Sequence, residues 1–242
     1  MWQILIEGWE PDLKYLEKHF ASGSDRIKRD SQTGNYIFDS ESLHEANTYE
    51  QVLQRTREQL AVLSGILITF RNSPHPLNIK EIYRLNSHGG KEFFLEVHEA
   101  IHAFDSTECT LSTSGSEKKA SLEPSPPSPV LLTAQLALRE PSVAKAMRLL
   151  AADDRKSWVN MYRILEVVTA DVGGERKLPA FGWCSAKDLD RFKHSSNSVA
   201  VAGDSARHGK ESCSPPSDPM SLEQASDFLH KVLQAWLRHK GV

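Results

Sequence analysis

The chain has 242 residues, of which 39% are hydrophobic and 25% are charged, and its formal net charge is −3. This composition is typical of a globular protein, and the small negative charge excludes a basic surface that would attract nucleic acid everywhere. No window of the sequence approaches the roughly 18 continuous apolar residues of a membrane span, so we expect no transmembrane helix and no membrane partner. The three cysteines lack paired spacing, which favours reduced thiols over a disulfide framework. Because the N-terminus does not resemble a signal peptide, we expect a cytoplasmic protein.

Residues 1–104 show the patterns of an α+β domain. Short apolar or alternating runs bounded by turn residues predict strands, and apolar residues at helical spacing predict helices. Thr48 is the expected N-cap of the longest of these helices. In chain order, the predicted elements are a strand at 2–9, a short helix after Asp12, a hairpin at 26–40, a helix at 49–70 and two strands around a turn at 86–90.

Residues 105–129 break this pattern. They are rich in serine and end in a proline-rich stretch, and they carry almost no large apolar side chains. Such a segment cannot bury enough apolar surface to offset the entropy of folding. We therefore expect a flexible linker that is extended at its proline-rich end.

Residues 130–242 return to helical spacing and predict an all-α helical bundle. Pro141 separates the first two helices, and Ser185 and Ser221 are expected to cap two of the later ones. The predicted helices cover 130–138, 143–150, about 158–168, a short segment from 185 toward 192, and 221–236. Before the last helix lies a polar segment, which we predict to be a long loop. The expected fold class is therefore α+β, with a mixed sheet domain followed by a helical bundle.

One short motif allows a metal site. His98, Glu99 and His102 match the pattern H-E-x-x-H, which on a helix places both imidazoles on one face to bind zinc and lets the glutamate activate a bound water. The motif, however, continues an alternating run that begins at Phe93, which favours a strand. On a strand the two histidines would lie about 13 Å apart and could not share one metal. A strand with two outward-facing histidines is the favoured interpretation, and a zinc metallohydrolase is the alternative.

The densest cluster of polar residues is the segment 191–209, RFKHSSNSVAVAGDSARHG. A histidine such as His208 can move a proton at neutral pH, and an adjacent arginine, here Arg207, can hold a phosphate and stabilise charge on it. Such a pair suits metal-free cleavage of RNA through the substrate's own 2′-hydroxyl. The supporting candidates, which could bind phosphate or orient the imidazole, are Arg191, His194, Asn197 and Asp204.

With this Arg-His-Gly segment between its helices, region 130–242 resembles HEPN domains. These are small helical bundles, many of them ribonucleases or nucleotide-binding partners in toxin–antitoxin and phage-defence systems. The resemblance implies RNA as a partner and a metal-independent ribonuclease of a bacterial stress or phage-defence system, with His208 and Arg207 as catalytic residues. The family's motif separates its arginine from its histidine by an interval that neither Arg–His pair of this segment reproduces. No phosphate-binding glycine loop is present in the sequence, so we expect no cofactor.

The chain is also similar to uncharacterised bacterial proteins with the same layout of three segments. These segments are WVNMYRILEVVTADVGG, then RFKHSSNS…GDSARHG, then PPSDPMSLEQASDFLHKVLQAWL. This likeness implies no particular activity.

The six polar residues of segment 191–209 also have a structural interpretation. They could form a hydrogen-bonded staple that satisfies helix ends and ties the predicted loop to the bundle. In that case the protein is a non-enzymatic interaction module, in which the α+β domain binds a protein partner and the bundle forms a homodimer. The HEPN-like RNA-associated protein is the favoured hypothesis, and the interaction module is the alternative.

Overall fold

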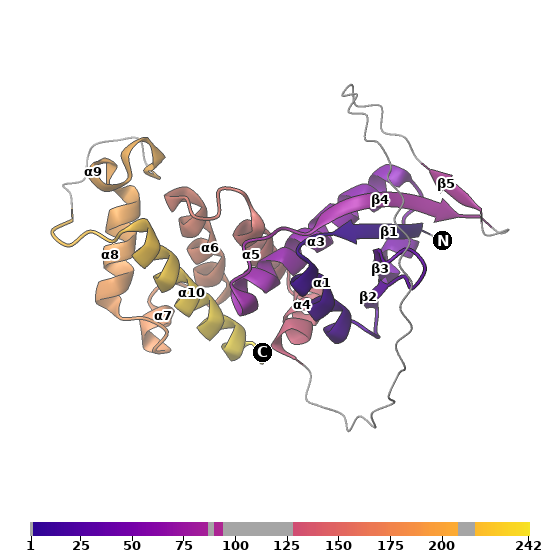
Figure 1. Cartoon of the computed structure of the whole chain (residues 1–242). Coiled ribbons are helices and arrows are strands. Elements are labelled where there is room, and N and C mark those ends of the chain that lie inside the picture. Colours follow the sequence, from indigo (N-terminus) through magenta and orange to yellow (C-terminus); the bar gives the residue numbers. More distant parts are fainter. Residues whose placement is uncertain (1, 87–89, 94–127, 208–215) are drawn as a thin grey trace.

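The computed structural model describes residues 2–86, 90–93, 128–207 and 216–242. Its N-terminal part contains an antiparallel sheet and its C-terminal part is helical, so the α+β fold class is confirmed (Figure 1). The sheet order is β2-β3-β1-β4-β5, and each of these neighbouring pairs is antiparallel. The strands are β1 (Trp2–Glu7), β2 (Asp25–Arg29), β3 (Tyr36–Ser40), β4 (Asn78–Leu85) and β5 (Lys91–Phe93).

The central strand β1 carries apolar side chains on both faces of the sheet. Ile4 belongs to the main core, whereas Leu5 joins a smaller apolar cluster with Ile37 and Tyr83. This follows from the alternation of side chains along a strand, which sends neighbours to opposite faces. The turn between β2 and β3 contains Gly34 with a φ of 71°, and it confirms the predicted hairpin.

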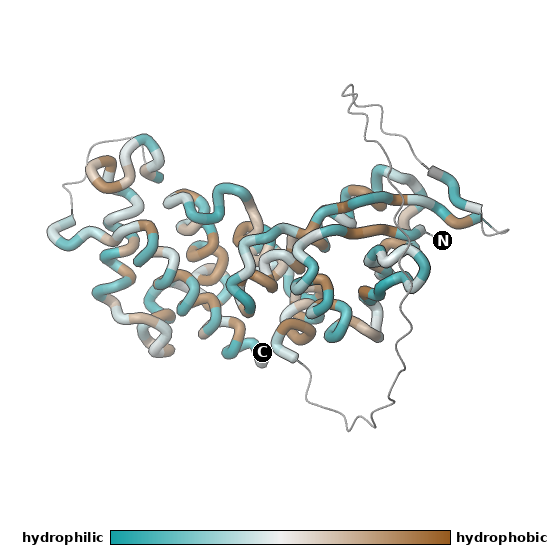
Figure 2. Tube along the Cα trace, viewed as in Figure 1, coloured by the Kyte–Doolittle hydropathy of each residue, from teal (hydrophilic) through white to brown (hydrophobic). Residues whose placement is uncertain are grey.

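The helices of the N-terminal part are α1 (Glu10–His19), α2 (Glu41–His44) and α3 (Tyr49–Arg71). Those of the C-terminal part are α4 (Pro129–Arg139), α5 (Pro141–Ala151), α6 (Trp158–Asp171), α7 (Lys177–Ala180), α8 (Ala186–Asn197), α9 (Val199–Ala202) and α10 (Leu222–His239). The longer helices carry both hydrophilic and hydrophobic residues, and the hydrophobic ones supply the core (Figure 2). None of the helices within the described ranges is both long and apolar enough to span a bilayer.

The predicted helix caps are present. The side-chain oxygens of Thr48, Ser185 and Ser221 each accept a hydrogen bond from a backbone N–H of the first turn that follows. The side-chain oxygen of Gln224 accepts a hydrogen bond from the backbone N–H of Ser221, which completes a capping box at the start of α10. One boundary differs, because α4 begins at Pro129 and so takes in the last residue of the predicted linker.

The prediction of a long loop from residue 191 onward is wrong for its first part. Helix α8 continues to Asn197, and α9 follows after Ser198. The buried stripe of α8 extends beyond Phe192 through Ser195 and Ser196. Because serine is polar, a pattern of hydropathy alone ends this helix too early. Both hydroxyls have partners: Ser195 accepts the N–H of Met220, and Ser196 donates to the carbonyl of Lys193.

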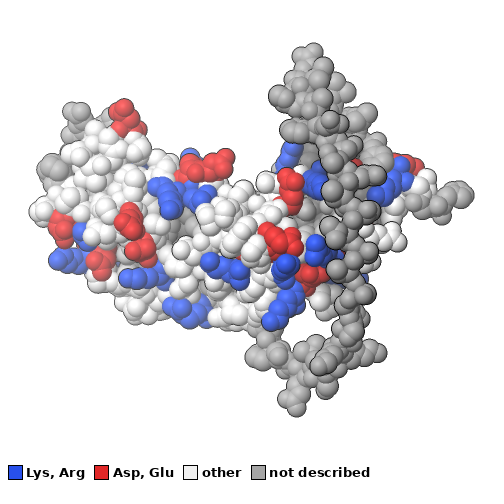
Figure 3. Space-filling view, viewed as in Figure 1, with Lys and Arg blue, Asp and Glu red and all other residues white. Residues whose placement is uncertain are grey.

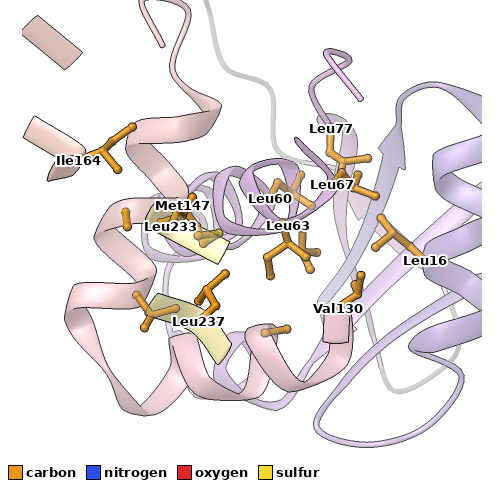
Figure 4. Close-up of a cluster of buried hydrophobic side chains, with 14 of the residues drawn as sticks. Leu16, Leu60, Leu63, Leu67, Leu77, Val130, Met147, Ile164, Leu233 and Leu237 are labelled. Atoms are coloured by element: carbon orange, nitrogen blue, oxygen red, sulfur yellow. The ribbon is translucent and has the colours of Figure 1, made fainter. Parts of the chain in front are cut away.

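Helix α3 contacts both parts of the molecule. It packs against β4 of the sheet and against α4 and α5 of the bundle, so one apolar core extends from Leu16 in α1 to Leu237 in α10 (Figure 4). The approach to α5 is closest at Gly65, where a Cβ atom would lie 2.1 Å from the carbonyl oxygen of Met147. A glycine is required there because any side chain would overlap that backbone. The division into domains at 1–104 and 130–242 stays a prediction.

Candidate functional site

Arg191 lies on α8 and reaches the chain that leads into α10. Its Nε donates to the carbonyl oxygen of Asp218 at 2.8 Å, and its Nη2 donates to the carbonyl oxygen of Pro219 at 3.0 Å. Nη2 also lies 3.1 Å from Oε1 of Gln224 and 3.1 Å from a carboxylate oxygen of Asp218. These are the contacts that the staple hypothesis expects, because they join a helix to the start of the next one.

Arg207 contacts a different helix. Its backbone N–H donates to the carbonyl oxygen of Ser196 at 3.0 Å. Its Nη2 lies 2.5 Å from Oε1 of Glu166 on α6, and its guanidinium carbon lies 3.9 Å from the ring centroid of Tyr162. The ion pair and the cation–π contact engage an edge and a face of the same guanidinium group. A phosphate would therefore have to compete with Glu166 for Arg207.

The other candidates of segment 191–209 are spread over the segment. His194 is exposed on α8, and Asp204 is exposed in the 3-10 turn Gly203–Ser205. Oδ1 of Asn197 is buried and has no hydrogen-bond partner among the described residues. His208 lies outside the described residues. The side chain of Arg191 therefore contacts the chain before α10, whereas that of Arg207 contacts α6. The pairing of Arg207 with His208 stays a prediction.

The zinc motif is not tested either, because His98, Glu99 and His102 lie outside the described residues. Within the ranges that the structure covers, no three His, Cys, Asp or Glu side chains gather closely enough to hold a metal ion. Cys184 is a free thiol whose pKa is raised to about 11 by burial, with a further contribution from the charge of Asp188. It is therefore protonated at neutral pH and poorly suited to be a nucleophile.

A cavity of about 730 Å³ lies beside α10, and we call it the α10 groove. One group of its lining residues is apolar, namely Ile68, Leu150, Met161, Leu229 and Leu233. Its charged lining residues are Arg155 and Lys156, from the turn between α5 and α6, and Glu223 and Asp227, from α10. None of these four forms an ion pair with a described residue.

Leu222 borders the α10 groove and is 47% exposed. It also lines a second hollow of about 500 Å³, together with Val201, Ala202 and Met220. In the described part of the chain, the exposed large hydrophobic side chains are those of Trp9, Leu138, Phe181 and Leu222. Covering Leu222 and the apolar lining of the hollows beside it would remove apolar surface from water.

His230 lies in the α10 groove and contacts Gln234, which connects α10 to α3. Its Nε2 lies 2.9 Å from the side-chain nitrogen of Gln234, which also reaches the carbonyl oxygen of Thr69 at 3.4 Å. An amide nitrogen can only donate, so Nε2 of His230 must be unprotonated in this contact. Burial lowers the pKa of His230, and the charge of Asp227 opposes this effect. Both observations favour the neutral imidazole.

Sequence reasoning did not identify the α10 groove, because its lining residues come from segments that are far apart in the chain. Periodicity assigns Leu222 to the apolar stripe of the last helix, and it cannot tell whether a neighbouring helix covers that residue. Comparison with known proteins gives no further guidance: no family model, no curated protein and no solved structure matches the chain.

Proposed function

We propose that the protein is a non-enzymatic interaction module whose helical part forms a homodimer through the α10 groove. The observation that carries the proposal is the arrangement of charge around Leu222, with cations on the turn between α5 and α6 and anions on α10. The α+β part then remains available to a protein partner.

Under two-fold symmetry, a surface that carries charges of both signs can pair with its own copy. In a symmetric dimer the same patch of both copies forms the interface, so that each contact occurs twice with the roles exchanged. Arg155 and Lys156 of one copy can therefore face Glu223 and Asp227 of the second copy, and the reverse. Leu222 of each copy would cover the apolar lining of the opposite groove, which removes apolar surface from water.

The contacts of the two arginines support a structural role for segment 191–207. The guanidinium group of Arg191 donates hydrogen bonds to the chain before α10. That of Arg207 forms an ion pair with Glu166 and a cation–π contact with Tyr162. Lysine and arginine side chains are interspersed with aspartate and glutamate on the face shown in Figure 3. That face therefore lacks the continuous basic field that gathers nucleic acid.

Sedimentation velocity at micromolar concentration tests the dimer. We expect the wild-type protein to sediment as a dimer, with twice the mass of one chain, which is 27.1 kDa. Leu222→Asp places a charge in the apolar centre of the proposed interface, and we expect it to sediment as a monomer. The matched control is Leu138→Asp, because Leu138 on α4 is similarly exposed, at 55%, and lies outside the α10 groove.

Two results would overturn the proposal. One is a wild-type chain that is monomeric under these conditions. The other is a dimer that survives Leu222→Asp and dissociates with Leu138→Asp, which would assign the interface to a different surface.

A further inference from the structure

A second cavity, of about 370 Å³, lies between the edge of the sheet and helices α2 to α5, and we call it the α3 pocket. Its volume is within the range of small-molecule sites, which are mostly apolar with a few well-placed polar groups. Its apolar lining residues are Phe38, Val62, Leu63, Ala134, Ala137, Leu138 and Ala144. The three alanines leave open the space that larger side chains of α4 and α5 would fill.

One end of the α3 pocket is polar and is organised by hydrogen bonds. Nε2 of Gln59 donates to the hydroxyl oxygens of Ser40 at 3.0 Å and Ser42 at 2.7 Å. These two bonds fix the amide, and they leave its oxygen, Oε1, buried without a hydrogen-bond partner among the described residues. The Gln59 amide and the Ser42 hydroxyl are thus held in place at this end of the α3 pocket.

Asp25 supplies a carboxyl group at the same end. It lies directly opposite Ser40 in the β2–β3 ladder, and the Ser40 hydroxyl hydrogen-bonds to its carboxyl group. Burial raises the pKa of Asp25, and the nearby charges of Glu41 and Asp39 raise it further. Asp25 forms no ion pair with a described residue. Ser40 thus links Asp25, which accepts a hydrogen bond from its hydroxyl, to the Gln59 amide, which donates to its oxygen.

The charge of the whole lining also favours a cation. Three carboxylates, of Asp25, Glu45 and Glu58, line the α3 pocket with two guanidinium groups, of Arg55 and Arg148. The formal sum of these five charges is −1 (two positive and three negative groups), and the Arg55 guanidinium is held at the carbonyl oxygen of Ser42, to which its Nη1 donates at 2.6 Å.

We propose that the α3 pocket binds a small primary amine with a short apolar chain. The ammonium group donates to the Asp25 carboxylate, and the chain lies against the apolar lining residues. An ammonium group suits this end because it offers three donors and a positive charge from a single atom. The proposal is independent of the dimer, since it concerns different residues of the chain.

Titration of the full-length protein with three small molecules of one shape tests this site. Isoamylamine, isoamyl alcohol and isovalerate share a branched apolar chain and differ in carrying a positive charge, no charge or a negative charge. Binding is followed by amide chemical shifts of the labelled protein near neutral pH. We expect saturable shifts with isoamylamine that include Ser40 and Gln59, and weaker binding of the alcohol and the carboxylate.

Variants locate the site. Asp25→Asn keeps the shape and removes the charge, and we expect the affinity for isoamylamine to fall about tenfold or more. Ala137→Met fills the apolar space and should abolish binding, and exposed Asp190→Asn on α8 is the control that should leave binding unchanged. If Asp25→Asn does not fold, the three-compound series on the wild-type protein decides the question. Equal binding of amine and alcohol, stronger binding of isovalerate, or no binding of isoamylamine would each overturn the proposal.

Discussion

Arg191 and Ser221 share one acceptor. Oε1 of Gln224 lies 3.1 Å from Nη2 of Arg191 and 3.1 Å from the backbone nitrogen of Ser221. The arginine of α8 is thus part of the capping box that starts α10, and a change at Arg191 affects the position of that helix end.

We predict that Arg191→Ala lowers the free energy of unfolding by about 2 kcal/mol, because it leaves two backbone carbonyls and the Gln224 side chain without their charged donor. Arg191→Lys should recover only part of this loss, since an ammonium group lacks the planar arrangement of donors. Urea denaturation measures both. The control is Lys187→Ala, an exposed position on the same helix, where we expect a change within about 0.5 kcal/mol. An equal loss in Arg191→Ala and Lys187→Ala would show that Arg191 does not join the helices.

Gly65→Ala should destabilise the protein, although alanine is the better helix former. At an exposed helical site the change from glycine to alanine gains about 1 kcal/mol. At Gly65 the new Cβ would lie 2.1 Å from the Met147 carbonyl oxygen, and forcing α3 and α5 apart should cost about 3 kcal/mol. Thermal unfolding compares this variant with Arg57→Ala, at an exposed position of α3. A stabilised Gly65→Ala variant would contradict the close packing of α3 on α5.

His230 should make stability depend on pH. Because burial lowers its pKa in the folded state below the ordinary value of 6.5, the unfolded chain takes up the proton first as pH falls. The contribution of His230 to stability is therefore constant above about pH 6.5 and decreases as pH falls from there toward the folded pKa. We expect His230→Gln to lose less stability than the wild type between about pH 7 and pH 5.5.

Urea denaturation of both proteins at equal concentration measures this difference. His19, whose pKa is also lowered, contributes to both proteins and cancels in the comparison. Identical pH profiles would show that the imidazole of His230 is not held in its neutral form.

An RNA-cleavage assay with a chelator present separates the proposed function from the RNA hypothesis. If segment 191–207 is structural, wild type and His208→Ala both leave RNA intact. A ribonuclease, in contrast, would cleave in the presence of chelator and lose that activity in His208→Ala. The second outcome would replace the interaction module with a metal-independent ribonuclease.

Local chemistry accounts for what the sequence could predict. Hydroxyl caps such as Thr48 and Ser221 and turn residues such as Gly34 are properties of a few consecutive residues, and the structure confirms them. The strand predicted from Phe93 to Ile101 is described only at its start, in β5. The end of α8 was not predictable in this way, because the buried positions 195 and 196 are serines whose hydroxyls have partners.

The surfaces that we propose as binding sites depend on contacts between distant segments. Gly65 has no special signal within α3, and its role follows from the position of α5. The α10 groove and the α3 pocket each combine residues from several elements. A single sequence without the fold does not place those residues together.

Charge reversal tests the dimer most directly. One chain carries Arg155→Glu and Lys156→Glu, and a second chain carries Glu223→Lys and Asp227→Lys. In a symmetric interface each variant places like charges opposite one another in both halves, whereas a mixed pair restores opposite charges in both halves. We predict by sedimentation velocity that each variant alone is a monomer and that an equimolar mixture forms the dimer. Monomers in the mixture, or dimers of either variant alone, would contradict the α10 groove as the interface.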